Sequence, residues 1–107
     1  YDNLSIDDKL NISVNSKHAL IAATRLSKGT IEQIYMALRL AAADIIFEKD
    51  KKPILLDDAF AMYDNKRMGN TMRFMAENME QVIIFSCHTR EKLMADKLGL
   101  KYNFIRL

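Results

Sequence analysis

Two short runs of purely apolar residues constrain the fold of this chain more than any other feature. Ile54 to Leu56 and Val82 to Phe85 lack the alternation of apolar and polar residues that a half-exposed strand shows. Each run is therefore expected to form a strand that is covered on both faces, as in parallel sheets. The segment between them has the length of a helical crossover, so the two strands should pair in parallel. The sequence predicts an α/β fold.

Helix signals flank both runs. Thr30 and Gln33 form a capping-box pair that is expected to start a helix. The apolar stripe of this helix is predicted to comprise Ile31, Ile34, Tyr35, Leu38, Ala42, Ile45 and Ile46. Asp64 can cap a second helix. Four methionines of the second helix follow helical spacing and are expected to pack in the core: Met68, Met72, Met75 and Met79.

The two ends of the chain carry weaker signals. Apolar residues recur at every second position on both sides of residues 7–9, which predicts an amphipathic hairpin with one exposed face. Residues 16–25 are ambiguous, since 19–23 could form a buried strand or a short helix. Thr89 and Gly99 are expected to bound a short helix, and residues 102–107 are expected to form a last strand.

Length limits the chain to one domain. Its 107 residues, half of them hydrophobic, can bury a single core but are few for a complete nucleotide-binding fold. We expect one partial domain, with a hairpin and lead-in over residues 1–24 and the main lobe over residues 25–107. The sequence begins at Tyr1 and not at a methionine, so we expect it to be a segment of a longer protein.

Charge and cysteine content narrow the possible partners and setting. A net charge of +2 leaves no electrostatic footprint for nucleic acid or a membrane. The sequence has neither an apolar run of membrane-spanning length nor a secretory signal. Cys87 is the single cysteine, which rules out an internal disulfide and indicates a reducing, cytoplasmic setting.

A pair of carboxylates, Asp57 and Asp58, follows the first apolar run directly. Ligands of parallel α/β sheets bind beyond the carboxyl ends of the strands. One carboxylate there can hold a magnesium ion, and its neighbour can accept a proton from an attacking water. The alternative is an Asp pair that starts a turn and caps a helix.

His88 ends the second apolar run and is expected at the same edge of the sheet as Asp57 and Asp58. There its imidazole can contact a terminal phosphate, or it can be a structural, hydrogen-bonded histidine. Cys87 is expected to be a small buried residue pointing away from His88, because strand side chains alternate between faces. A Cys–His dyad is therefore not expected. With a single cysteine and two histidines far apart in the sequence, a zinc cluster is not expected either, and His18 is expected to be structural.

The four residues Ser27-Lys28-Gly29-Thr30 stand at the start of the first predicted helix. A serine hydroxyl, a glycine that permits close backbone approach and the free N–H groups of a helix start together form an anion site. A plain capped helix start is the alternative.

In this order, the three features resemble the signature motif, the Walker B strand and the histidine switch of an ABC-type ATPase head. The stretch 26–41 is similar to the signature helix of the SMC-like, RecF- and RecN-related ATPases of DNA repair and chromosome maintenance, and 58–64 is similar to their D-loop. The resemblance covers residues 24–107. It implies the C-terminal lobe of a P-loop NTPase head, with a mainly parallel sheet, flanking helices and an N-terminal β-hairpin.

The same resemblance implies ATP and Mg²⁺ as cofactors. Asp57 would hold Mg²⁺, Asp58 would be the general base, and His88 would sense the γ-phosphate. The nucleotide-binding residues that it implies, acting on ATP held by a second head, are Ser27, Lys28, Gly29, Thr30 and Asp64. The phosphate-gripping motif G-x-x-x-x-G-K-[ST] does not occur in the chain, so the phosphate-loop lobe is absent and this segment alone should not hydrolyse ATP.

The implied partners are the N-terminal lobe of the same head, which should precede Tyr1 with a coiled coil, a second head joined through ATP, and DNA. Asp58 stands where glutamate is commoner in the family, and Lys28-Gly29-Thr30 where Gly-Gly-Gln is usual. Two other functions therefore remain open: a degenerate head that dimerises around ATP without turnover, and a free-standing α/β regulatory domain that binds no nucleotide.

Overall fold

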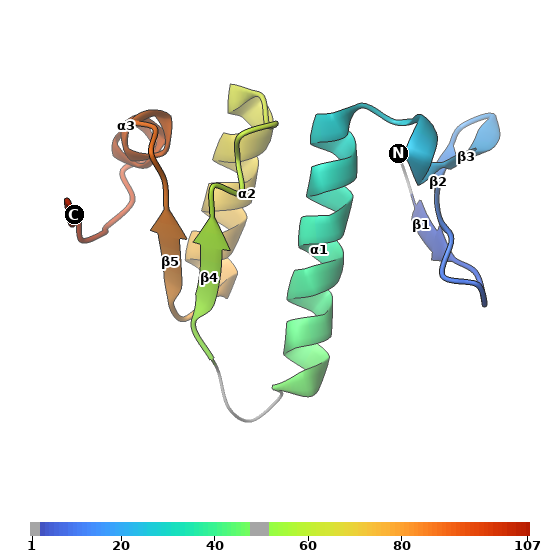
Figure 1. The fold of residues 1–107 in the computed structure, drawn as a ribbon, viewed down its shortest axis with the longest axis horizontal. Coiled ribbons are helices and arrows are strands. Elements are labelled where there is room, and N and C mark those ends of the chain that lie inside the picture. Colours follow the sequence, from blue (N-terminus) through green and yellow to red (C-terminus); the bar gives the residue numbers. More distant parts are fainter. Residues whose placement is uncertain (1–2, 48–51) are drawn as a thin grey trace.

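The computed structural model describes residues 3–47 and 52–107 and arranges them around two separate sheets. Figure 1 shows a small three-stranded sheet at one end and the long helix α1 (Lys28–Ile46) beside it. A second sheet lies at the other end, together with helices α2 (Asn65–Asn78) and α3 (Arg90–Lys97). The strands of the second sheet point toward the end at which α1 and α2 begin. Strand tips and helix starts therefore share one side of the molecule.

The N-terminal sheet consists of β1 (Asn3–Ile6), β2 (Ile12–Ser16) and β3 (Ala19–Ala22), all antiparallel. The predicted hairpin is confirmed, with Leu4 opposite Val14. Its turn is held by the Asp7 carboxylate, which accepts hydrogen bonds from the backbone N–H groups of Lys9 and Asn11 at 2.9 and 2.8 Å. The ambiguous segment after it forms an exposed strand, β3, followed by a single 3-10 turn, η1 (Ala23–Arg25).

Helix α1 begins earlier than predicted and buries a different face. Its N-cap is Ser27, whose side chain accepts a hydrogen bond from the backbone N–H of Thr30. The buried apolar side chains are Met36 and Leu40, while much of the predicted stripe is exposed, including Ile45 and Ile46. The predicted stripe is wrong because this helix is apolar on almost every side, so periodicity could not single out the face that packs.

The second sheet pairs β4 (Ile54–Asp57) with β5 (Val82–Phe85) in parallel, and α2 (Asn65–Asn78) connects them. The parallel pairing is as predicted, and Asp64 caps α2 as predicted. The predicted methionine core is also confirmed, since three of the four methionines are buried and Met79 packs against them. The full core cluster comprises Met36, Leu40, Leu56, Phe60, Tyr63, Met68, Met72, Met75 and Ala95.

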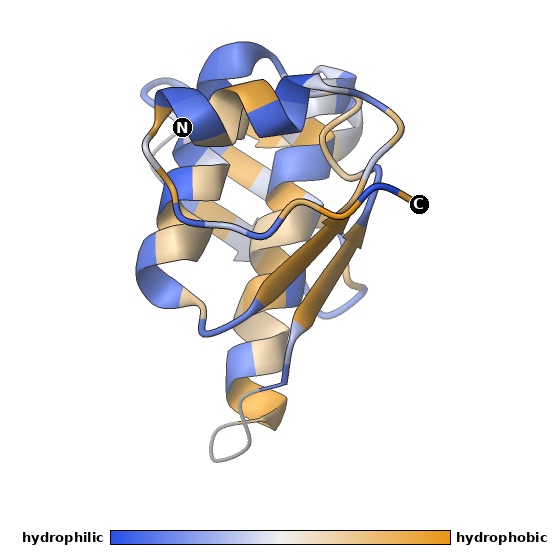
Figure 2. Ribbon diagram, turned by 90° about the vertical axis from the view of Figure 1, so that its left-hand side faces the viewer, coloured by the Kyte–Doolittle hydropathy of each residue, from blue (hydrophilic) through white to orange (hydrophobic). Residues whose placement is uncertain are grey.

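One face of the β4–β5 sheet is bare in the described part of the chain. Leu55, Ile83 and Phe85 are 56%, 38% and 46% exposed, and Figure 2 shows these apolar strands in front of the helices with no helix over them. The prediction of strands covered on both faces is therefore wrong for these residues taken alone. Within residues 3–47 and 52–107 the β4–β5 sheet is parallel and the larger, N-terminal sheet is antiparallel, so a mainly parallel sheet is not confirmed.

The C-terminal part consists of α3 (Arg90–Lys97) and an extended tail. Gly99, with φ of 66°, ends α3 as predicted, because its N–H and that of Leu100 bond back to the carbonyls of Asp96 and Ala95. Thr89 takes the N-cap position but makes no side-chain capping bond. The predicted strand over 102–107 is wrong: this segment has no strand to pair with in the described chain, and Tyr102 instead bonds to Asp96. None of the helices in the described ranges is long and apolar enough to span a membrane.

Candidate functional site

The carboxyl ends of β4 and β5 bring three of the predicted residues to one edge. Asp57 is the last residue of β4 and lies opposite Phe85. The N–H of Asp58 donates to the Phe85 carbonyl at 2.9 Å, which extends the strand pairing by one step. Asp58 then turns the chain with φ of 49°, a left-handed conformation that aspartate tolerates better than most residues. His88 Nε2 lies 3.8 Å from Asp58 Oδ1, and both side chains are about half exposed.

The backbone that carries His88 is held by a short chain of polar contacts. The N–H of His88 donates to Ser86 Oγ at 3.0 Å, and Ser86 Oγ lies 3.0 Å from Glu91 Oε2. Glu91 is buried in the first turn of α3, where a carboxylate is favoured by the helix dipole. The loop after β5 is therefore fixed from α3, and the imidazole of His88 is left free for other contacts.

Cys87 lies in a different place from the one predicted. Strand β5 ends at Phe85, so the alternation of strand side chains no longer applies to residues 86–88. Cys87 is exposed, and its Sγ, a donor atom of His88 and a carboxylate oxygen of Asp58 all lie within 4.8 Å of one another. The expectation of a buried cysteine is wrong, and the proximity of this thiol to an imidazole and a carboxylate was not predicted. The other histidine, His18, is exposed in the turn between β2 and β3.

A second cluster joins the start of α1 to the start of α2. Ser27 Oγ and Thr30 Oγ1 are 2.8 Å apart, and the Arg67 guanidinium donates to Thr30 Oγ1 at 2.6 Å. The Asp64 carboxylate accepts from the N–H of Arg67 at 2.7 Å. Ser27, Thr30 and Asp64, which sequence analysis assigned to nucleotide binding, thus also tie the two helix starts together.

Gly29 has a local structural reason to be glycine. A Cβ atom at this position would lie 2.5 Å from the carbonyl oxygen of Met62 and 2.9 Å from the Arg67 side chain. Gly29 and Thr30 are buried at this contact, whereas Ser27 and Lys28 are exposed. A ligand in solution can therefore reach Ser27 and Lys28 directly, but not the side chain of Thr30.

Sequence analysis missed two arginines that hold these clusters. Arg90 donates to the carbonyls of Phe60 and Tyr63 at 3.1 and 2.7 Å, and to Asn65 Oδ1 at 3.1 Å, so it fixes the loop from 58 to 64. Arg67 bridges the helix starts. Each cation stands in the first turn of a helix, where the helix dipole disfavours positive charge. An arginine in the first turn of a predicted helix was therefore a sequence feature that indicated a specific partner for each of these side chains.

Tyr63 belongs to the same loop and is almost fully buried. Its ring packs edge-on against Phe60 at 5.4 Å between centroids. Within the described chain its hydroxyl has no hydrogen-bond partner. Burial, reinforced by the negative charge of Glu32 and partly opposed by Arg67, raises the pKa of Tyr63 to about 12.

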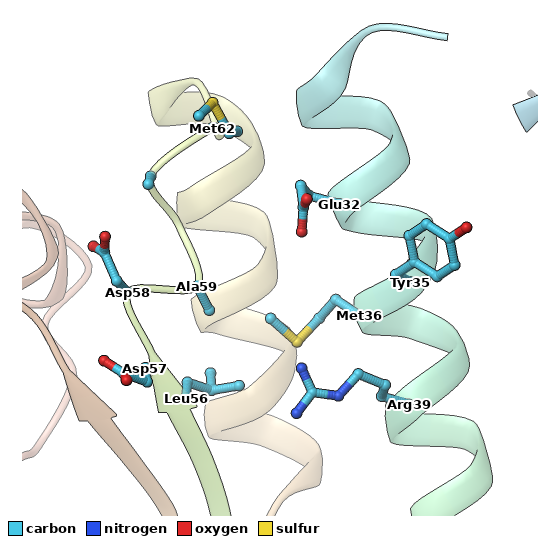
Figure 3. A pocket seen from close by; sticks show the side chains of 10 residues that line it. Glu32, Tyr35, Met36, Arg39, Leu56, Asp57, Asp58, Ala59 and Met62 are labelled. Atoms are coloured by element: carbon cyan, nitrogen blue, oxygen red, sulfur yellow. The ribbon is translucent and has the colours of Figure 1, made fainter. Parts of the chain in front are cut away.

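A hollow of about 250 Å³ separates α1 from the tip of β4. Figure 3 shows Glu32, Met36 and Arg39 entering it from α1, while the carboxylates of Asp57 and Asp58 point away from α1. The hollow is smaller than the roughly 300–1,000 Å³ of ordinary ligand pockets. It is therefore not a complete nucleotide pocket, and the two carboxylates face the exposed edge beside β5.

Asp57 meets the requirements of a magnesium ligand. Its carboxylate is exposed at the strand tip, and hard oxygen donors are the ligands that Mg²⁺ prefers, usually with several waters retained. One protein carboxylate supplemented by water and phosphate oxygens is the usual composition of such a site. The residue present therefore fits the ion that sequence analysis assigned to it.

Comparisons with known proteins bear on the fold. No protein-family model matches the chain. A solved SMC ATPase, from a study of ATP-driven dimerization and DNA-stimulated activation of these ATPases, aligns with 87% of the chain at a TM-score of 0.66 and 17% sequence identity. The fold is that of part of an SMC ATPase. The chain covers 60% of that solved structure.

The chain also resembles a sequence relative whose name states no activity. The chain is 36% identical over 73 residues to the uncharacterized protein YhaN of Bacillus subtilis (strain 168). The match includes 65% of this chain and only 8% of YhaN. The chain thus spans a small part of that relative, and the more specific RecF- and RecN-related class stays a prediction.

Proposed function

We propose that this chain is the C-terminal half of an ATP-binding and ATP-hydrolysing head that dimerises around ATP. Residues 25–107 form its signature, Walker B and histidine-switch lobe, and residues 1–24 form its hairpin and lead-in. The observation that carries the proposal is the approach of His88 Nε2 to Asp58 Oδ1, 3.8 Å apart, at the tips of adjacent parallel strands within an SMC-type fold. An acid–base pair at this edge stands where α/β sheets bind their ligands.

In the proposed head, each residue at the exposed edge of the sheet has a separate role in phosphoryl transfer. Asp58 accepts the proton of the attacking water, and His88 contacts the γ-phosphate beside it. Asp57 holds Mg²⁺, which when bound neutralises charge on the phosphate oxygens. Phosphoryl transfer depends mainly on positioning and charge stabilisation. The backbone that carries both side chains is fixed by the bonds from His88 N–H to Ser86 and from Asp58 N–H to Phe85, which suits it to this role.

The start of α1 acts on the ATP of a second head. The hydroxyls of Ser27 and Thr30 share one hydrogen bond, and Thr30 Oγ1 also accepts from Arg67. Of the two hydroxyl protons, one is used in the shared bond and the other has no acceptor within the described residues. The exposed Ser27 can thus donate to a γ-phosphate, with the positive charge of Lys28 and the N–H of Gly29 next to it. Asp64 contributes by holding Arg67, and through it Thr30, in place.

The bare face of the β4–β5 sheet supports an incomplete head. Leu55, Ile83 and Phe85 form an apolar surface that a complete α/β sheet would cover. We assign the cover to the N-terminal lobe of the same head, which also supplies the phosphate loop. The second partner is another copy of the head, joined through ATP. DNA, with a role in repair or chromosome maintenance in the cytoplasm, is the third.

The test uses the complete polypeptide that contains these residues, with Asp58 changed to Asn. Removing a general base should lower ATP turnover by about 10²–10⁴-fold while ATP-dependent dimers persist. Asp8→Asn, in the exposed turn of the hairpin, is the matched control and should leave turnover unchanged. Turnover is measured by phosphate release and dimerisation by light scattering. A polypeptide with no phosphate loop, or an Asp58→Asn variant with full turnover, would contradict the proposal.

A second candidate, a scaffold that dimerises with ATP but does not hydrolyse it, is favoured by one observation. The shorter Asp58 stands where glutamate is commoner in the family, and its carboxylate is already engaged at 3.8 Å by His88. In that case the unmodified polypeptide should form ATP-dependent dimers without measurable phosphate release, and Asp58→Asn should change neither property.

A further inference from the structure

We propose that Asp58, Cys87 and His88 form a binding site for a divalent transition-metal ion, with zinc as the best-matched ion. The three residues come from two loops, one after β4 and one after β5, and meet beyond the tips of the strands. This site is distinct from the magnesium position at Asp57, because its donors are sulfur and nitrogen as well as oxygen. The sequence did not predict this site, because strand alternation was applied to Cys87 and His88 although β5 ends at Phe85.

The distances between the donor atoms suit one shared ion. Ligands about 2.0 to 2.3 Å from a tetrahedral zinc ion lie roughly 3.4 to 3.6 Å from one another. The nitrogen of His88 and the oxygen of Asp58 are 3.8 Å apart, and all three donor atoms lie within 4.8 Å of one another. Contraction by about an ångström, within reach of exposed side-chain rotamers, completes the geometry.

The type of donor selects the metal. A thiolate and an imidazole favour zinc and other borderline-soft ions, whereas Mg²⁺ prefers an all-oxygen shell. All three residues are exposed, so an ion can enter from solvent and keep water in a fourth position. The frame under them is fixed by the bonds from His88 N–H to Ser86 and from Asp58 N–H to Phe85. A site with a fixed backbone loses less entropy when an ion orders its side chains.

Occupancy has a consequence that rests on the proposed function. An ion held here takes the carboxylate of Asp58 and the imidazole of His88, which are the groups assigned to proton transfer and phosphate contact. Zinc should therefore inhibit ATP turnover of the complete head, but it should not unfold the protein when ATP is absent. The binding itself does not depend on nucleotide, so the two proposals can fail separately.

The test measures metal binding to the purified 107-residue chain, with oxygen excluded to keep Cys87 reduced. Cobalt is the spectroscopic probe, because a cobalt–thiolate bond gives a charge-transfer band, and zinc is then titrated to displace it. Cys87→Ala should abolish the band, and Cys87→Ala, His88→Ala and Asp58→Asn should each weaken zinc binding at least tenfold. His18→Ala and Asp8→Asn are the matched controls and should bind zinc as the unmodified chain does.

Circular dichroism of each variant verifies folding, which these exposed side chains should not affect. Absence of the thiolate band, equal zinc affinity in Cys87→Ala, or an effect of Asp8→Asn as large as that of Asp58→Asn would overturn the proposal. If zinc binds as expected but the complete polypeptide has no ATPase activity, the metal site stands and the proposed function falls.

Discussion

The contact between Gly29 and the Met62 carbonyl leads to a sharp prediction about stability. Glycine is normally unfavourable in a helix, and replacing it with alanine stabilises an exposed helix position by up to about 1 kcal/mol. At Gly29, however, the new Cβ would lie 2.5 Å from a backbone oxygen, a distance that requires the loop or the helix to move. Overpacking of this kind costs about 1–3 kcal/mol. We therefore expect Gly29→Ala to reduce the free energy of unfolding by about 1–2 kcal/mol.

Gly69 provides the matched control within the same chain. It also lies in a helix, α2, but a Cβ there would meet the sulfur of Met94 at 3.2 Å. A flexible methionine can shift by a few tenths of an ångström, so Gly69→Ala should be neutral or stabilising by up to about 1 kcal/mol. Both variants are compared by urea denaturation followed by circular dichroism. If Gly29→Ala is as stable as Gly69→Ala, the close approach to Met62 does not constrain this position.

The remaining predictions concern the loop between β4 and α2. Burial raises the pKa of Tyr63 to about 12, so the free energy of unfolding should fall by at most about 3 kcal/mol as the pH rises from about 10 to about 12. In Tyr63→Phe this part of the fall should be missing when denaturation is measured across that pH range. If the variant and the unmodified chain lose the same stability over that range, the prediction is contradicted. Arg90→Met should destabilise by about 2–4 kcal/mol, since it removes two partly buried hydrogen bonds to the carbonyls of Phe60 and Tyr63 and one exposed bond to Asn65. Arg73→Met on the exposed side of α2 should change stability by less than about 0.5 kcal/mol in the same assay. Asp64→Ala should cost about 1 kcal/mol through loss of the α2 cap, and an unchanged unfolding midpoint would show that the cap does not matter.

Local patterns in the sequence predicted the elements whose signals are themselves local. The methionine spacing predicted the buried face of α2, because that helix is polar on its other side. Asp64 predicted the cap of α2, and Gly99 predicted the end of α3. The parallel pairing of β4 and β5 followed from the length of the connection between two apolar runs. These features depend on neighbours within a few residues or on chain length, so they can be read before the fold is known.

Features that depend on contacts between distant segments could not be predicted in this way. The buried face of α1 is chosen by contacts with the core, including Met36 and Leu40, and an almost entirely apolar helix gives no periodic signal for it. Arg90 reaches carbonyl groups about thirty residues away along the chain, as its bond to Phe60 shows. Cys87 was misplaced because the exact end of β5 decides its direction, and element boundaries are the least certain part of a sequence reading.

The residues assigned to the site divide into two groups, according to the contacts that each makes within the fold. Gly29, Thr30 and Asp64 have contacts that explain them without a nucleotide: close approach to Met62, a bond to Arg67 and a helix cap. Among the strand-tip residues, Asp58 also has a local role, because it adopts a left-handed turn that aspartate tolerates. The exposed carboxylate of Asp57 and the half-exposed imidazole of His88 have no such role in the described part of the fold. The case for nucleotide chemistry therefore depends on Asp57, Asp58 and His88 more than on the helix entrance.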